Sequence, residues 1–181
     1  AIEARRVRGD DGKARLEQSG QTGSRKKTSN KWFETQDTIA YWREFQKPKI
    51  IFSEIVSEPQ FYYDEKGYYP EATVFFISGD NLKYLIALLN STPVTYIFKK
   101  FYAGGELVGK YRYKKAFLEN LPLPQISATE QQPFEALVDQ ILAAKQRDPA
   151  ADTRALEAEI DRRVSALYGL SPEEIAIVEG K

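Results

Sequence analysis

The stretch ATVFFISGDNLKYLIALLNSTPVTYIFKKF (residues 72–101) decides the fold, because its pattern changes from strand to helix within a few residues. Residues 72–77 are a short apolar run rich in β-branched and aromatic side chains, which predicts a buried strand. Asp80 is suited to cap a helix, and apolar side chains recur at helical spacing from Leu82 to Leu89. A second helix is predicted after the break, with Pro93 in its first turn and Val94, Ile97, Phe98 and Phe101 on its inner side.

The residues before this stretch predict further strands. Residues 49–56 are rich in β-branched side chains, and residues 61–63 form a short aromatic run before a turn. Together with residues 72–77, these segments predict a β-meander of three or four strands. A helix is expected over residues 37–45, which space three large apolar side chains at helical intervals.

The residues after this stretch predict a helical end to the chain. Leu-Pro-Leu-Pro at residues 121–124 predicts an extended segment, and helices are expected over residues 130–146 and 153–168, with Gly169 ending the second. A third helix begins at Ser171 with a capping box and a proline in its first turn. The predicted fold class is therefore α+β, a small, mostly antiparallel sheet with packed helices followed by a C-terminal helical segment.

The composition of the 181-residue chain excludes several kinds of chemistry. The chain has no cysteine and no histidine, which removes disulfides, thiol nucleophiles, cysteine zinc sites and the usual general base. No apolar run is long enough to span a bilayer, so no membrane partner is expected. Residues 64–66 (Asp-Glu-Lys) resemble part of a magnesium nuclease site, but a surface turn explains them better. The chain begins without Met, from which we expect one domain of a longer cytoplasmic polypeptide.

The aromatic residues near one turn allow two interpretations. Tyr62, Tyr63, Tyr68 and Tyr69 surround the turn at residues 64–67. Aromatic rings can stack on unpaired bases, but we expect these four to be half-buried residues of a sheet.

Charge is unevenly distributed although the formal net charge is zero. Residues 1–125 carry 20 basic and 15 acidic side chains, whereas residues 126–181 carry 6 and 11. The positively charged first part could bind a polyanion, whereas the negatively charged second part would be repelled by one.

The densest positive charge lies between Lys99 and Lys115, where six basic residues stand against Glu106 alone. Alternation over residues 108–113 predicts a strand with its basic side chains facing outward and its tyrosines facing inward. Glycines nearby permit close approach of the backbone to phosphates, although a charged edge strand would look similar. The residues predicted to bind DNA are Lys99, Lys100, Lys110, Arg112, Lys114 and Lys115, together with Arg25, Lys26 and Lys27 near the N-terminus.

Structural explanations remain open for some of these residues. Lys99 and Lys100 would also suit the C-terminal turn of a helix, where positive charge is stabilised by the helix dipole. Arg25, Lys26 and Lys27 would also suit a solvated polar tail.

Several short motifs resemble one known family when they are taken in order. The motifs are Lys-Pro-Lys-Ile (47–50), Phe-Tyr-Tyr-Asp (61–64), Leu-Leu-Asn-Ser (88–91), Tyr-Arg-Tyr-Lys-Lys (111–115), Leu-Pro-Leu-Pro (121–124), Leu-Glu-Ala-Glu-Ile-Asp (156–161) and Leu-Tyr-Gly-Leu (167–170). With these motifs in this order, the chain resembles the C-terminal target-recognition region of TaqI-like N6-adenine DNA methyltransferases, and the same region of fused type IIG restriction-modification enzymes and related phage-defence methylases. The similarity extends over residues 31–179.

The resemblance implies a division of labour with a methyltransferase domain that this chain does not contain. That domain would bind S-adenosylmethionine and flip the target adenine, while this chain would read double-stranded DNA without a cofactor of its own. The chain lacks a glycine-rich cofactor turn and an Asn-Pro-Pro-aromatic turn, so it is expected to be non-catalytic by itself. The parent would be a bacterial cytoplasmic methyltransferase, with or without endonuclease activity. Arg112 could read guanine, and the lysines would hold phosphates.

The expected organisation has three parts. Residues 1–30 form a polar linker or mobile arm, residues 31–125 the α+β target-recognition core, and residues 126–181 a helical scaffold. Two alternatives stay open. A protein-interaction module would dock a partner through its acidic C-terminal helices and expose apolar helix faces. A stand-alone nuclease would cleave DNA with a metal ion.

Overall fold

The structure is a computed structural model that describes residues 7–8, 14–15, 29, 41–71, 73–106 and 108–181. The chain divides into two compact units, residues 1–43 and residues 44–181. In the first unit, β1 (Val7–Arg8) pairs with β2 (Ala14–Arg15) in antiparallel fashion. The predicted helix over residues 37–45 begins outside the described residues, and Trp42–Gln46 forms a 3-10 helix, η2.

The second unit is built on a three-stranded antiparallel sheet. Its central strand β3 (Lys49–Ser53) pairs with β5 (Tyr62–Asp64) on one side and with β6 (Val74–Ile77) on the other. The predicted meander is therefore wrong, because the strand that comes first in the sequence lies between the two later ones. The central strand is the most deeply buried of the three, and it includes the buried residues Lys49, Ile50 and Phe52. The edge strand β6 is half-buried rather than buried as predicted.

The predicted strand over residues 49–56 is divided between two sheets. After β3 ends, β4 (Ile55–Val56) pairs in antiparallel fashion with β7 (Tyr111–Arg112). Glu54 joins the two sheets through its backbone, since its N–H donates to Thr73 C=O at 3.0 Å and its C=O accepts from Tyr113 N–H at 2.7 Å. The strand predicted over residues 108–113 is correspondingly limited to β7.

The switch from strand to helix occurs where it was predicted, but with a different cap. Helix α1 (Leu82–Asn90) has Asn81 at its N-cap position, not Asp80, and Asn81 adopts the left-handed conformation (φ 56°) without a side-chain capping bond. Asparagine tolerates this conformation better than most residues. Helix α2 (Thr92–Ile97) follows at once and is capped by the hydroxyl of Ser91, with Pro93 in its first turn as predicted.

The C-terminal part of the chain is helical, and two of its helices begin with a capping box. After a short α3 (Lys115–Leu118) and the extended proline segment, α4 (Ala128–Arg147), α5 (Arg154–Leu167) and α6 (Pro172–Val178) follow. The capping box at Ser171 is confirmed, and a second one at Ser127 starts α4 two residues earlier than predicted. Gly169 ends α5 with φ +65°, a conformation that suits glycine.

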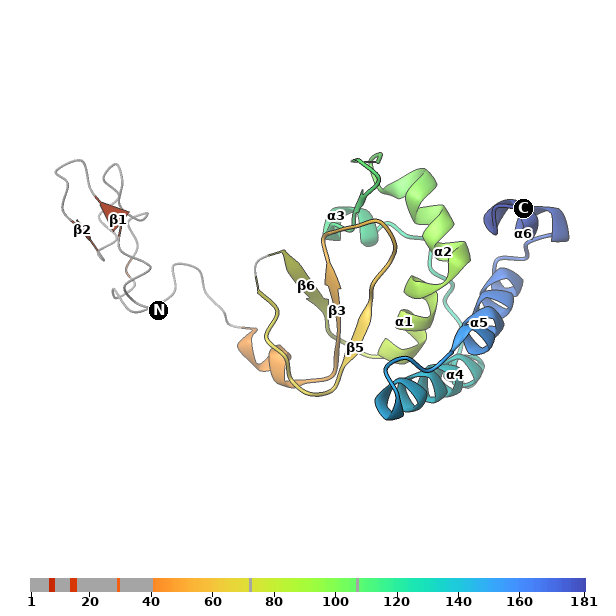
Figure 1. Cartoon of the computed structure of the whole chain (residues 1–181), viewed down its shortest axis with the longest axis horizontal. Coiled ribbons are helices and arrows are strands. Elements are labelled where there is room, and N and C mark those ends of the chain that lie inside the picture. The colour runs from red at the N-terminus through yellow and green to blue at the C-terminus, as the bar shows by residue number, and fades with distance from the viewer. Residues whose placement is uncertain (1–6, 9–13, 16–28, 30–40, 72, 107) are drawn as a thin grey trace. The chain divides into compact units, whose positions relative to one another are not determined.

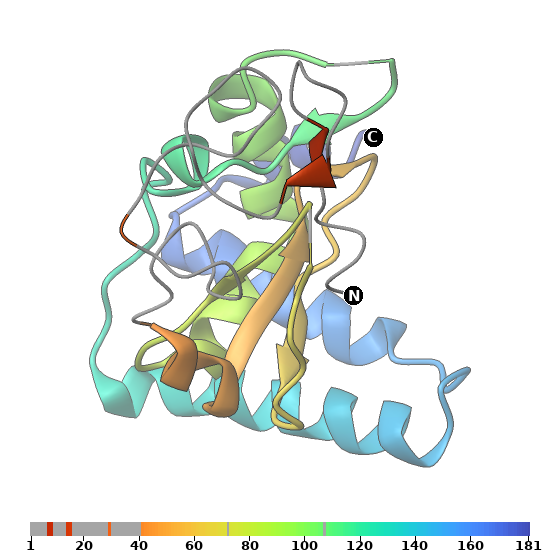
Figure 2. The same ribbon diagram turned by 90° about the vertical axis from the view of Figure 1, so that its left-hand side faces the viewer.

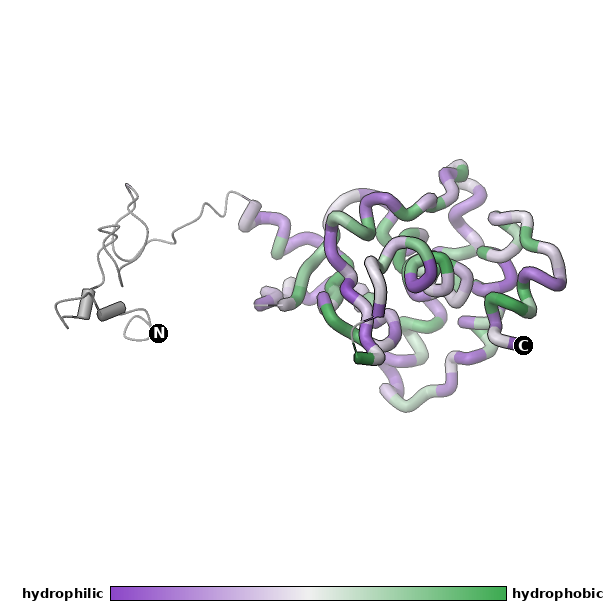
Figure 3. Tube along the Cα trace, turned by 90° about the horizontal axis from the view of Figure 1, so that it is seen from above, coloured by the Kyte–Doolittle hydropathy of each residue, from purple (hydrophilic) through white to green (hydrophobic). Residues whose placement is uncertain are grey.

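The sheet and the helices of residues 44–181 share one core. Helix α1 packs on one face of the sheet, and α4 and α5 lie on the far side of α1 (Figure 1, Figure 2). Figure 3 shows hydrophobic and hydrophilic residues interspersed along the trace of residues 44–181. The α+β class is confirmed. No helix among the described residues is long and apolar enough to cross a membrane. The core includes Ile50 and Phe52 of β3, Ile86 and Leu88 of α1, Phe134 and Val138 of α4, and Ile160 and Val164 of α5.

Candidate nucleic-acid interface

A buried ion pair fixes the segment that follows β5. Lys49 and Asp64 are both fully buried and form a salt bridge, and Lys49 Nζ also donates to Phe45 C=O at 2.7 Å. The Asp64 carboxylate accepts backbone N–H bonds from Lys66 at 2.8 Å and Tyr68 at 2.9 Å. Burial alone would raise the pKa of Asp64, but these donors outweigh it and hold the pKa below its ordinary value. The expectation of a surface turn is therefore wrong for Asp64, whose carboxylate is committed to the fold.

Two further polar contacts tie the helices to the sheet and to each other. The Asn90 amide accepts from Phe61 N–H at 3.1 Å and donates to Phe61 C=O at 2.9 Å. The Asp161 carboxylate accepts from the N–H of Thr92 at 2.8 Å and from its hydroxyl at 2.6 Å, which joins α5 to the start of α2. Both contacts connect residues that are far apart in the sequence, so they fix the packing of whole elements.

The proline segment is held by two tyrosine hydroxyls. Tyr84 of α1 donates to Pro124 C=O at 2.9 Å, and Tyr168, which follows α5, donates to Pro122 C=O at 3.1 Å. Burial raises the pKa of Tyr84 to about 12, so its hydroxyl remains a donor at neutral pH. We call Lys49, Asp64, Tyr84, Asn90, Asp161 and Tyr168 the motif frame, because each lies in one of the short motifs quoted above or, for Tyr84, four residues before one.

Six of the nine basic residues predicted to bind DNA lie in residues 99–115, which we call the basic loop. Lys99 and Lys100 lie in a π-helical turn, η3 (Phe98–Tyr102), that continues α2, whereas Lys114 and Lys115 lie at the start of α3. Helix α3 packs against η3, and a Cβ added at Gly104 would lie 3.2 Å from the Phe117 ring. The chain therefore folds back on itself, and both ends of the basic loop are brought to the same part of the unit (Figure 1).

The six described cations of the basic loop are not equivalent. Lys99 forms a salt bridge with Glu58 at 2.7 Å and lies 5.1 Å from the centre of the Tyr111 ring. Lys100 lies 5.8 Å from the Tyr96 ring. Within the part of the chain that the structure describes, five of these cations have no acidic partner and are available to an external anion. These five are Lys100, Lys110, Arg112, Lys114 and Lys115.

The prediction that the tyrosines of this segment face inward is confirmed for Tyr113. Its ring is buried, stacks on Phe98 with ring centres 4.2 Å apart and contacts Phe61 edge-on at 5.6 Å. Burial raises the pKa of Tyr113. Tyr111 is half-buried, as is Arg112 beside it. The strand β7 thus anchors the basic loop in the core immediately before Lys114.

Phe101 contradicts the prediction that it lines the inner side of its helix, since its side chain is 75% exposed. The π-helical turn explains the error. A π-helix has more residues per turn than the 3.6 assumed in a helical pattern, so the side chain three residues after the buried Phe98 is rotated toward solvent. No periodicity in the sequence distinguishes such a turn from an ordinary α-helix.

The loop between η3 and β7 is closed by its only acidic residue. The Glu106 carboxylate accepts from Gly109 N–H at 2.9 Å and from the Tyr111 hydroxyl at 3.3 Å. Val108 next to this clip has φ +50° and is 93% exposed. Sequence reasoning missed Val108, because nothing in the sequence marks it as left-handed.

The remaining aromatic residues and cations singled out in the sequence differ in exposure and in whether the structure describes them. Tyr62, Tyr68 and Tyr69 are exposed rather than half-buried as expected, while Tyr63 is half-buried. Tyr69 stacks on Phe45 with ring centres 4.9 Å apart. The predicted DNA contacts of Arg25, Lys26 and Lys27 lie outside the described residues.

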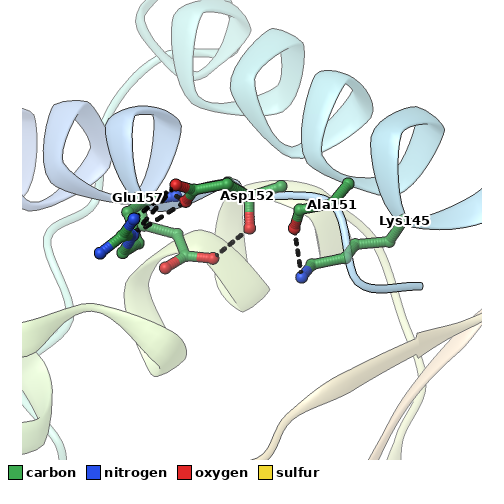
Figure 4. A network of polar contacts seen from close by, with 6 residues as sticks. Lys145, Ala151, Asp152 and Glu157 are labelled. Carbon is green, nitrogen blue, oxygen red and sulfur yellow. Dashed lines mark hydrogen bonds and ion pairs between the residues drawn. The ribbon is translucent and has the colours of Figure 1, made fainter. Parts of the chain in front are cut away.

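The acidic C-terminal helices satisfy most of their polar groups internally. At the corner between α4 and α5, Lys145 donates to Ala151 C=O, Arg154 binds Asp152, and Glu157 accepts from Thr153 (Figure 4). In residues 126–181, all of which are described, Ile177 is the one exposed large hydrophobic residue. Helices α4 and α5 therefore bury apolar residues against the rest of the unit, whereas no residue of α6 is buried.

The described residues contain no cluster of three or more acidic, histidine or cysteine side chains that could hold a metal ion. A comparison with protein families matches residues 14–123 to the family described as the TaqI-like C-terminal specificity domain. The matched region includes the three-stranded sheet, α1, α2 and the whole basic loop.

Proposed function

The chain belongs to the family of TaqI-like C-terminal specificity domains, and from this membership we propose that it is the sequence-recognition domain of a site-specific adenine-N6 DNA methyltransferase or of a fused restriction-modification enzyme. The observation that supports this proposal best is the set of five cations without an acidic partner among the described residues, Lys100, Lys110, Arg112, Lys114 and Lys115, in a chain of zero net charge. Clustered cations without internal partners are the electrostatic signature of a surface that contacts phosphates.

Arg112 and the lysines would have different roles in this interface. Arg112 lies in β7 opposite Ile55 of β4, so its backbone is fixed by strand pairing, and its guanidinium could bind the two acceptors of a guanine. Lys110, Lys114 and Lys115 flank it and would hold phosphates, which set the register of the protein on the duplex. Lys100 is a further phosphate contact, and Lys99 contributes less because Glu58 already neutralises it.

The chemistry of methylation would belong to the methyltransferase domain of the parent polypeptide. That domain would bind S-adenosylmethionine and receive the flipped adenine, while this chain grips the duplex and is non-catalytic by itself. The helices α4–α6 would support this arrangement as a scaffold, since α4 and α5 complete the core behind the sheet and α1. We place the parent in the bacterial cytoplasm, in a type IIG or related phage-defence system.

Fluorescence anisotropy with a labelled duplex over a range of salt concentrations tests the proposal. For the triple variant Lys110→Ala, Arg112→Ala, Lys114→Ala we expect weaker binding and a salt slope smaller by about 2–3, because each lost phosphate contact removes about 0.9 from the slope. The matched control removes three cations from the C-terminal helices and their end, Lys145→Ala, Arg154→Ala, Lys181→Ala, and should change the slope much less. An unchanged slope in the first variant would show that the basic loop is not the interface.

A further inference from the structure

Two exposed apolar side chains lie in η3 and in the loop that joins η3 to β7. Phe101 and Val108 are 75% and 93% exposed, although a phenyl ring and a branched aliphatic chain are normally removed from water. Both lie within the basic loop, where Lys100 precedes Phe101 and Lys110 follows Val108 by two residues. Apolar groups set among cations differ from the scattered hydrophobic residues of an ordinary surface.

The conformation of Val108 adds an independent observation. A β-branched residue with φ +50° is strained, and strain of this kind occurs preferentially at functional sites. The glycines on this loop, Gly104, Gly105 and Gly109, also have positive φ, which costs them little. Glycine at position 108 would therefore satisfy the backbone better than valine does, so packing and backbone geometry give no reason for the valine side chain.

Contacts on both sides of Val108 fix the loop that carries its side chain. Glu106 binds Gly109 N–H and the Tyr111 hydroxyl, so the only acidic group of the basic loop is turned to the loop's own backbone and to β7. Tyr111 in turn belongs to the strand that is paired with β4. The loop is thus tied to the sheet on one side of Val108, and it packs through Gly104 against α3 on the other.

From these observations we propose that Phe101 and Val108 form an apolar tip that enters a groove of duplex DNA and contacts base edges and sugars there. This inference rests on the DNA-recognition function proposed above and adds the part of the contact that is not electrostatic. Phosphates border a groove on both sides, and along the chain the two residues of the tip are flanked by Lys100 and Lys110. Inside a groove, apolar side chains contact thymine methyl groups and sugars, which lysines do not recognise.

Salt-dependent binding separates the tip from the cations. With Phe101→Ala and Val108→Gly, each titrated with a duplex at several salt concentrations, we expect affinity to fall about five- to tenfold at every salt concentration, because removing apolar contact area weakens binding without releasing counterions. The salt slope should remain that of the wild-type chain. Ile177→Ala, which removes an exposed apolar side chain from α6, is the matched control and should bind as the wild type does.

Thermal unfolding of the same variants completes the test. Val108→Gly should unfold at the wild-type temperature or above it, because glycine relieves the left-handed strain. A lower unfolding temperature would assign Val108 a structural role and overturn its place in the tip. Wild-type affinity in both tip variants, with the wild-type slope intact, would overturn the tip and leave the proposed function standing. Wild-type protein without any salt-dependent binding would overturn the proposed function itself, and the tip with it.

Discussion

The motif frame and the basic loop satisfy their polar groups in opposite ways. In the motif frame, each polar side chain bonds to a segment distant in the sequence, as Asn90 does to Phe61 and Asp161 to Thr92. In the basic loop, five of the six cations have no acidic partner among the described residues, and the backbone takes positive φ at four positions. The residues of the motif frame thus hold the fold together, while the cations of the basic loop are left available to bind an external anion.

This difference explains why most of the short motifs that resemble the family lie outside the proposed DNA contacts, the exception being Tyr-Arg-Tyr-Lys-Lys (111–115). Lys-Pro-Lys-Ile contains the buried Lys49, Leu-Leu-Asn-Ser contains Asn90, and Leu-Tyr-Gly-Leu contains Tyr168. Each of these residues has a partner that only this fold provides, so a substitution would be costly. Loops that carry binding residues on such a scaffold can change without loss of the fold.

The largest effect is expected from breaking the buried ion pair. Asp64→Ala leaves the ammonium group of Lys49 buried without its partner and removes an acceptor from Lys66 and Tyr68. We expect a loss of about 3–5 kcal/mol in the free energy of unfolding, measured by urea denaturation. Asp152→Ala, which breaks an exposed pair with Arg154, is the control and should have little effect. A loss no greater than that of the control would show that the ion pair between Lys49 and Asp64 does not stabilise the fold.

The pH dependence of stability provides a second test of the same pair. The folded-state pKa of Asp64 is lower than its ordinary value, so its contribution to stability is fully present above the unfolded-state pKa and is lost as pH falls through the folded-state pKa. The stability difference between wild type and Asp64→Ala should therefore shrink between about pH 7 and about pH 3. Urea denaturation at both pH values measures it, and a difference that grows on acidification would contradict the pKa direction.

A smaller loss is expected from the contact between α1 and β5. Asn90→Ala leaves Phe61 N–H and C=O without the amide that binds both, in a partly buried position. The expected cost is about 1–3 kcal/mol in the free energy of unfolding. Asn120→Ala is a matched control, because its amide also donates to a backbone carbonyl, that of Ala116, but at an exposed site. Equal losses in the two variants would mean that Asn90 does not tie the helix to the sheet.

The contrast between locally and distantly determined contacts also explains which features of the fold could be predicted from the sequence. Helices with strong local signals were predicted well, since the capping box at Ser171 and the glycine at position 169 act within a few residues of the helix ends. The strand order was not predicted, because pairing of β3 with both β5 and β6 depends on which strand is buried most. Local signals also misplaced the cap of α1, where backbone conformation favoured Asn81 over Asp80.

The candidate site was predicted in composition but not in detail. The positive charge of residues 99–115 is visible in the sequence, whereas the pairing of Lys99 with Glu58 joins residues 41 positions apart. The outward rotation of Phe101 follows from a π-helical turn that has no sequence signal, and the left-handed Val108 carries none either. Sequence therefore located the basic loop, and only the structure distinguishes its free cations from its paired one.

The smallest predicted effect concerns the difference between the free cations of the basic loop and Lys99, which is paired with Glu58. Lys110 has no acidic partner among the described residues, whereas Lys99 is bound by Glu58 and its side chain is only 20% exposed. In salt-dependent anisotropy titrations we expect Lys110→Ala to lower the slope by about 0.9, the value for one phosphate contact, and Lys99→Ala to lower it by less. Each change should be accompanied by a loss of affinity that is small compared with that of the triple variant.

Glu58→Ala reverses the comparison and provides its sharpest test. Removal of this carboxylate leaves Lys99 without its acidic partner, so the variant should bind DNA more tightly than the wild type and with a steeper salt slope. The double variant Glu58→Ala, Lys99→Ala should lose this gain, which shows that it acts through Lys99 and not through the general charge of the chain. If Glu58→Ala tightens binding equally with and without Lys99, the carboxylate repels DNA directly, and the pairing of Lys99 has no part in how the basic loop divides its cations between fold and ligand.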